Sequence, residues 1–119
     1  MKRLTAYMYP KCSTCRKALK WLEENGYEPE KVNIMETPPS GEELRKLQKQ
    51  SGVPLRKMFN TSGELYKSMN LKEKIGAMSD DELLELLASH GKLIKRPIVT
   101  DGNRTTVGFD EERFAEVWA

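Results

Sequence analysis

Three features are scarce or absent in this 119-residue chain, and each excludes a class of protein. Its apolar runs are a few residues long, far short of the ~20 that cross a bilayer, so we expect no membrane association. Its 20 basic and 18 acidic residues nearly cancel and interleave, so we expect no direct nucleic-acid binding. Residues 1–7 lack the apolar core and cleavage site of a signal peptide, which favours a cytoplasmic protein. We also expect a monomer.

Potential metal ligands and disulfide partners are also scarce. The chain has two cysteines, Cys12 and Cys15, and one histidine, His90. A structural zinc site needs four ligands, so we expect no metal. A bridge between residues three apart would close a very short loop and would constrain the unfolded chain little. The cysteine pair is therefore not expected to serve stability.

Periodicity and turn residues predict a mixed α/β order along the chain. An apolar, β-prone stretch at residues 4–9 predicts a strand, a helical pattern from Ser13 is ended by Asn25-Gly26, and residues 30–34 predict a second strand. Capping-box spacings at residues 40–43 and 79–82 predict helices in the middle. Residues 98–108 predict a hairpin, and Asp110 caps a final helix.

The order of these elements predicts the fold class. A β-α-β unit, a run of helices and a β-β-α end together indicate an α/β protein with a thioredoxin-like fold and an inserted helical subdomain. The length suits one domain. We therefore expect a single thioredoxin-like domain over residues 1–119, with the helical insertion at approximately residues 40–91.

The spacing of the cysteines predicts redox chemistry. Residues three apart on a helix lie about 5–5.5 Å apart, within reach of a disulfide. Cys12 falls at a helix N-terminus, where free backbone N–H groups favour a thiolate, and Lys11 and Arg16 add positive charge. Cys15 lies one turn further on the apolar side. We expect Cys12 to be the exposed nucleophile and Cys15 the shielded resolving thiol.

Three segments give the chain a resemblance to a known family. They are residues 9–17 (Tyr-Pro-Lys-Cys-Ser-Thr-Cys-Arg-Lys), residues 36–39 (Glu-Thr-Pro-Pro), and residues 93–98 (Leu-Ile-Lys-Arg-Pro-Ile) with Val-Gly-Phe at 107–109. In this order they resemble the family that joins glutaredoxin-dependent arsenate reductases to Spx-type transcription regulators. The resemblance implies that Cys12 is the catalytic cysteine, that Pro97 is a cis-proline facing the cysteines, and that Arg96 contacts an anion near Cys12.

Departures from the arsenate reductase pattern concern the arginines. The resemblance implies that arsenate reductases of this family use one cysteine and hold the oxyanion with three arginines. Arg96 takes one of these places and Arg56 a second, whereas Gly108 occupies the third. Arg104 and Arg113 lie nearby but do not fall on the pattern. The missing arginine and the added Cys15 weaken the arsenate interpretation.

The Spx-type regulators offer a different class of function, in which the CxxC is a redox switch and the partner is the RNA polymerase α subunit. The loop at residues 59–63 and the following Glu64-Leu65-Tyr66 resemble instead the reductase-related branch. The chain also ends in Val117-Trp118-Ala119 rather than in a basic tail. The regulator hypothesis is weakened by these features and stays open.

The combined hypothesis is a thiol–disulfide oxidoreductase related to arsenate reductase. Catalysis is assigned to Cys12 and Cys15, which would form the redox disulfide, and substrate binding to Lys11, Arg56, Arg96 and Pro97. No bound cofactor is expected. Electrons would come from glutathione or another low-molecular-weight thiol, or from a glutaredoxin or thioredoxin system. The alternatives are the polymerase-binding regulator and an arsenate reductase.

Overall fold

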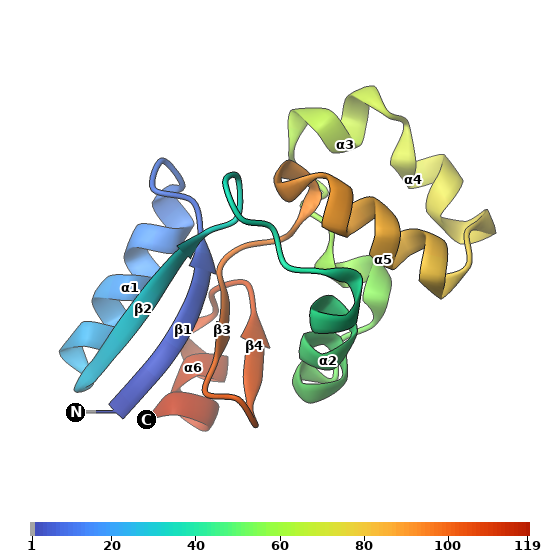
Figure 1. Cartoon of the computed structure of the whole chain (residues 1–119). Helices are drawn as coiled ribbons and strands as arrows, with labels where there is room; N and C mark the ends of the chain where they lie inside the picture. The colour runs from blue at the N-terminus through green and yellow to red at the C-terminus, as the bar shows by residue number, and fades with distance from the viewer. Residues whose placement is uncertain (1) are drawn as a thin grey trace. The chain divides into compact units, whose positions relative to one another are not determined.

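The computed structural model describes residues 2–119, which divide into two compact units. The first contains the chain up to Asn33 together with Arg96–Ala119, and the second contains Ile34–Lys95. The first unit therefore holds both cysteines, and the second holds most of the helices (Figure 1). No helix within residues 2–119 is long and apolar enough to cross a membrane.

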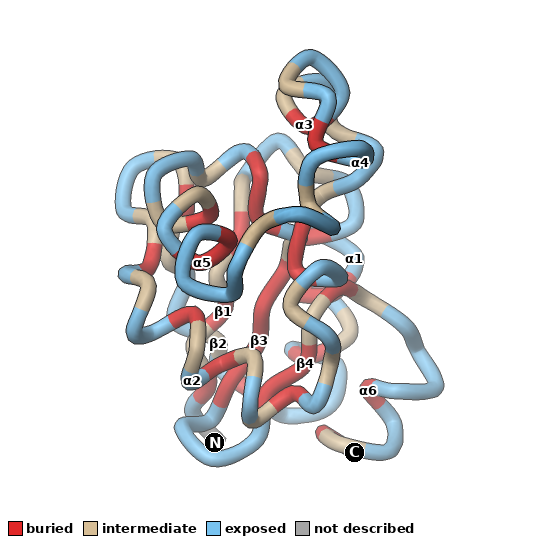
Figure 2. Tube along the Cα trace, turned by 90° about the vertical axis from the view of Figure 1, so that its right-hand side faces the viewer, coloured by how far each residue is buried: buried red, intermediate tan, exposed pale blue. Residues whose placement is uncertain are grey.

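A four-stranded mixed sheet organises the first unit, in the order β2-β1-β3-β4. Strand β1 (Lys2–Met8) pairs in parallel with β2 (Tyr27–Asn33) and antiparallel with β3 (Ile98–Thr100). Strand β4 (Thr105–Val107) completes the predicted hairpin with β3. All three residues of β3 are buried, as the tube coloured by burial shows (Figure 2).

Helices α1 (Ser13–Glu24) and α6 (Glu111–Trp118) pack on one face of this sheet. The core that they share with the strands consists of Leu4, Ala6, Met8, Cys15, Ala18, Leu19, Leu22, Tyr27, Val99, Phe114 and Trp118. The two helices also touch, because the Trp21 ring meets the Phe114 ring edge-on at 5.3 Å between centroids. Trp118 is 1% exposed, and its indole N–H donates to Thr106 Oγ1 at 3.1 Å. The core thus packs α1 and α6 against the sheet.

The second unit is built from short helices. They are α2 (Gly41–Ser51), η1 (Leu55–Met58), α3 (Glu64–Ser68), α4 (Leu71–Lys74), η2 (Ile75–Ala77), α5 (Asp80–Ser89) and η3 (Gly91–Leu93). Helix α2 packs against α5 and buries Leu44, while α5 buries Leu87.

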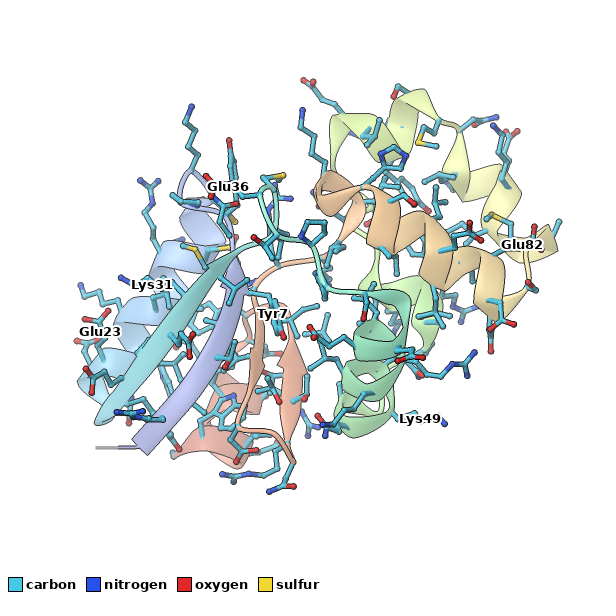
Figure 3. The ribbon with its side chains drawn as sticks, viewed as in Figure 1. Tyr7, Glu23, Lys31, Glu36, Lys49 and Glu82 are labelled. Carbon is cyan, nitrogen blue, oxygen red and sulfur yellow. The ribbon has the colours of Figure 1, made fainter. Side chains whose placement is uncertain are left out.

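Helix caps fix the starts of the two longest helices in this unit. The Ser40 hydroxyl accepts from Glu43 N–H at 3.2 Å, and the Ser79 hydroxyl accepts from Glu82 N–H at 3.2 Å. Glu82, labelled in Figure 3, returns a bond by accepting from the Ser79 backbone N–H at 3.0 Å. This reciprocal pair satisfies donors that a helix N-terminus otherwise leaves free. The capping box predicted at residues 79–82 is confirmed.

Two element boundaries differ from the sequence prediction. Strand β2 begins at Tyr27 rather than at residue 30, and it includes Pro29. Proline lacks the N–H that a central strand needs, but β2 is an edge strand, where the missing donor is tolerated. The stretch from residue 70 to residue 77, whose pattern predicts one short helix, is an α-helical turn followed by the 3₁₀ turn η2.

The packing of α1 on the sheet gives a stability prediction. Leu22 is fully buried and its neighbour Glu23 is exposed, so the two positions form a matched pair. We expect Leu22→Ala to lower the free energy of unfolding by about 2–5 kcal/mol, because it removes buried methyl groups and leaves a cavity. Glu23→Ala should change it by less than about 0.5 kcal/mol. Urea unfolding followed by circular dichroism measures both, and equal losses would contradict this packing.

Candidate functional site

The first cysteine lies where strand β1 gives way to helix α1. Cys12 N–H donates to Tyr9 O at 3.0 Å, which closes a tight turn after the strand. Cys12 is then the N-cap of α1: its carbonyl accepts from Arg16 N–H at 3.1 Å, and its Sγ accepts from Cys15 N–H at 3.4 Å. The sulfur thus occupies the position where a serine or aspartate oxygen usually caps a helix.

The second cysteine lies in a different environment. Cys15 is fully buried within the core under α1, whereas Cys12 is half-buried. Both are thiols in this structure. One sulfur can therefore be approached from outside, and the other can be approached only from Cys12 or from the protein interior.

Different surroundings move the two thiol pKa values apart. Partial burial alone would raise the pKa of Cys12. Hydrogen bonds from the Cys15 thiol, the Cys15 backbone N–H and the Arg96 side chain, together with the Arg96 charge, outweigh it and lower that pKa. For Cys15, burial is the largest effect and raises the pKa to about 12. As the pH rises Cys12 is therefore the first of the two thiols to ionise, and Cys15 keeps its proton at neutral pH.

Arg96 supplies the positive charge beside Cys12. Its guanidinium lies over the Tyr9 ring, with 5.5 Å from Cζ to the ring centroid. Its Nη1 atom is buried and has no hydrogen-bond partner among residues 2–119. A buried donor without an acceptor is unfavourable by about 1–3 kcal/mol, and more when it is charged. An acceptor group of a bound molecule would relieve that cost.

Pro97 follows this arginine, and the Arg96–Pro97 peptide bond is cis. Pro97 is buried, and its carbonyl accepts from Gly108 N–H at 2.9 Å. Because Ile98 pairs with Tyr7, the residues just before β3 lie beside the end of β1, where the cysteine loop begins. The sheet register thus brings Arg96 and Pro97 to the cysteine pair.

The structure separates the predicted site residues into two groups. Cys12, Cys15, Arg96 and Pro97 lie in the first unit around the start of α1, and Lys11 is exposed next to Cys12 in the chain. Arg56 belongs to η1 of the second unit, where it is exposed.

Two details differ from what sequence reasoning supplied. Arg16 is exposed on α1, and the cation that lowers the Cys12 pKa is Arg96. Sequence reasoning also missed Tyr9, which receives the Cys12 N–H and holds the Arg96 guanidinium over its ring. A tyrosine at the end of an apolar strand carries no signal of such a role, because core tyrosines occur in the same pattern.

Within residues 2–119 no group of three or more His, Cys, Asp or Glu side chains is arranged to hold a metal ion. The polar groups gathered here are instead a thiolate-forming sulfur, a protonated thiol and a guanidinium. This set can break and form sulfur–sulfur bonds, with a cation placed for an anionic or polar part of the reacting molecule.

The sequence of this chain is similar to that of several known proteins. A model of the ArsC family matches residues 7–117. The Bacillus subtilis (strain 168) protein YusI is 61% identical over 116 residues, which is 98% of this chain and 98% of YusI. An Escherichia coli protein named arsenate reductase is 36% identical over 83% of this chain and 69% of its own length. Regulatory protein MgsR of B. subtilis (strain 168) is 31% identical over 92% and 85% of the two chains.

Solved structures of related proteins have the same fold as this chain. The crystal structure of an ArsC family related protein from Bacteroides fragilis superposes with a TM-score of 0.92, at 43% identity over 98% of this chain and 97% of that one. An arsenate reductase from Vibrio cholerae matches with a TM-score of 0.86, at 38% identity over 98% of both chains. These matches confirm the α/β, thioredoxin-like fold class and the family resemblance found in the sequence.

The two thiols lead to a titration prediction. We expect the rate of Cys12 alkylation by iodoacetamide, measured against pH, to titrate below the pKa of an ordinary cysteine. Arg96→Met should shift this midpoint upward, because it removes the guanidinium charge that favours the thiolate. Arg16→Met, on the exposed side of α1, should shift it less. Mass spectrometry assigns the alkylated residue, and an equal shift in both variants would contradict the role of Arg96.

Proposed function

The chain belongs to the ArsC family, and we propose that within this family it is a thiol–disulfide oxidoreductase. One observation carries the proposal: the helix N-terminus holds a half-buried Cys12 with a lowered pKa, three residues before a buried Cys15 whose pKa is raised to about 12. A nucleophile with a lowered pKa beside a thiol that stays protonated at neutral pH provides the two roles that stepwise disulfide exchange requires.

The reaction proceeds in two exchanges. The Cys12 thiolate attacks one sulfur of a substrate disulfide, forms a Cys12–substrate bond and expels the other substrate sulfur as a thiolate. That thiolate takes a proton from water. Formation of the new bond removes the Cys12 charge, which raised the pKa of Cys15, so Cys15 loses its proton to water and its thiolate attacks Cys12 Sγ. The substrate's second sulfur leaves as a thiolate and takes a proton from water, and Cys12–Cys15 becomes the disulfide. Two electrons pass from the cysteine pair to the substrate.

The surrounding residues bind and orient the substrate in this proposal. Arg96 is half-buried beside Cys12, and its guanidinium charge would attract an anionic group such as a glutathione carboxylate. Pro97 shapes the surface beside the cysteine pair. Lys11 and Arg56 are both exposed and accessible to an anionic substrate.

Electrons to restore the two thiols come from outside the chain. We assign the donor to glutathione or another low-molecular-weight thiol, or to a glutaredoxin or thioredoxin system, with no bound cofactor. Such reductants are abundant in the cytoplasm, where cysteines are kept as thiols. A cytoplasmic monomer is accordingly the proposed working form.

Two other functions have support from the comparisons. The likeness to a protein named regulatory protein MgsR favours a redox switch instead of an enzyme that turns over. The resemblance to Spx-type regulators implies the RNA polymerase α subunit as the partner of such a switch. The likeness to proteins named arsenate reductase favours oxyanion reduction. Against the latter, Gly108, which stands at the third arginine's place, has a φ of +82°, a conformation that residues other than glycine rarely adopt.

Substitution of each cysteine tests the division of roles. We expect Cys12→Ser to reduce disulfide turnover to the background rate, because it removes the attacking thiolate. Cys15→Ser should instead accumulate a mixed disulfide at Cys12 that mass spectrometry detects, because nothing resolves it. Ser13→Ala, between them in the chain, serves as the control and should retain activity. Undiminished turnover by Cys12→Ser would overturn the proposal.

A coupled NADPH-consumption assay distinguishes the three functions. Purified protein is offered a small disulfide or arsenate, each with the glutathione–glutaredoxin system and with the thioredoxin system. We expect many turnovers on the disulfide and none on arsenate. Turnover on arsenate would favour the oxyanion reductase. Reversible Cys12–Cys15 oxidation without turnover on either substrate would favour the switch, and a pull-down with the polymerase α subunit would then test its partner.

A further inference from the structure

The helical unit contains a groove of about 830 Å³ that includes neither cysteine. It lies within Ile34–Lys95 and is bounded by η1, by the segment from α3 to η2, and by the start of α5. In Figure 1 these elements form the green-to-orange part of the chain. Apart from Arg56, which is assigned to the anionic substrate above, no residue that lines this groove has a role in the proposed disulfide chemistry.

The rim of the groove is cationic. Four exposed basic side chains line it, namely Arg56, Lys57, Lys72 and Lys95. The ion pairs found within residues 2–119 join other side chains, so none of these four is neutralised by one. Asp80 is the only carboxylate residue in the lining. The groove therefore presents a surplus of positive charge in a chain whose overall charge is only +2.

The floor of the groove is apolar. Ile75 and Met78 are half-buried there, and Leu83 lies buried below them. Phe59 and Tyr66 add a tilted ring pair, with 6.3 Å between centroids. An apolar centre with a charged rim is the anatomy of protein–protein interfaces, and methionine adapts its shape to a partner's side chains.

The groove is open rather than enclosed, because about half of the residues that line it are exposed. Sites for small molecules bury most of their ligand, whereas an open groove suits a segment of another protein. We propose that this groove binds an acidic amphipathic helix of a partner protein. Its apolar face would lie on Ile75 and Met78, and its carboxylates would meet the basic rim.

A designed peptide tests this directly and independently of the thiol chemistry. The probe is a fluorescein-labelled 14-residue helical peptide with Leu and Trp on one face and Glu and Asp elsewhere. Controls are a scrambled peptide of the same composition and a peptide with Lys in place of each acidic residue. We expect the probe alone to raise fluorescence anisotropy, and to shift the backbone amide signals of groove residues in ¹⁵N-labelled full-length protein. Equal binding of the scrambled peptide, or no binding, would overturn the proposal.

Charge reversals separate the groove from general attraction. Lys72 lines the groove, whereas Lys74 lies on the same helix α4 but outside the lining, and both are exposed. We expect Lys72→Glu to weaken probe binding roughly tenfold and Lys74→Glu to weaken it less than about threefold at low salt. Cys12 alkylation should be unchanged in both variants. Equal weakening, or displacement of the probe by phosphatidylglycerol vesicles or by a short DNA duplex, would show a general anion-binding surface and overturn the proposal.

Discussion

The packing of helix α1 on the sheet is the interaction on which the rest of the site depends. The stripe of α1 that contains Cys15, Ala18 and Leu22 is buried against the sheet, and this burial fixes where the helix begins. The same burial removes Cys15 from solvent and raises its pKa, while it leaves Cys12 at the helix end. One packing contact thus produces the two unequal thiols, because residues three apart on a helix lie near one another yet differ in depth.

The second constraint is the sheet register, which joins distant parts of the chain. The antiparallel pairing of β3 with β1 brings Arg96 beside a loop near the N-terminus, where Tyr9 receives its guanidinium. The hydrogen bond from Gly108 to Pro97 then ties the hairpin to the same place. The charge beside Cys12 therefore depends on the fold of the whole first unit, whereas the cap at its sulfur is local.

This contrast explains what could be predicted from the sequence. Spacing alone predicts the CxxC at a strand-to-helix junction and the Ser79 cap, because each depends on a few adjacent residues. The start of β2 was missed because Pro29 normally argues against a strand, and only sheet order shows that it lies on an edge. The expectation for Arg16 relied on proximity in the chain, but Tyr9 and Arg96 meet only through strand pairing, which no local pattern contains.

The sulfur cap on α1 has a thermodynamic consequence for the direction of electron flow. Interactions that favour a Cys12 thiolate stabilise the reduced protein, but a sulfur bonded to another sulfur carries no charge for Arg96 or the helix N-terminus to stabilise. The same contacts that make Cys12 reactive therefore disfavour the Cys12–Cys15 disulfide relative to the two thiols. A pair biased in this way is a weaker reductant and a stronger oxidant than the same two cysteines in an unfolded chain. It therefore needs a less abundant supply of electrons from its donor to return to two thiols than a pair without these contacts would need.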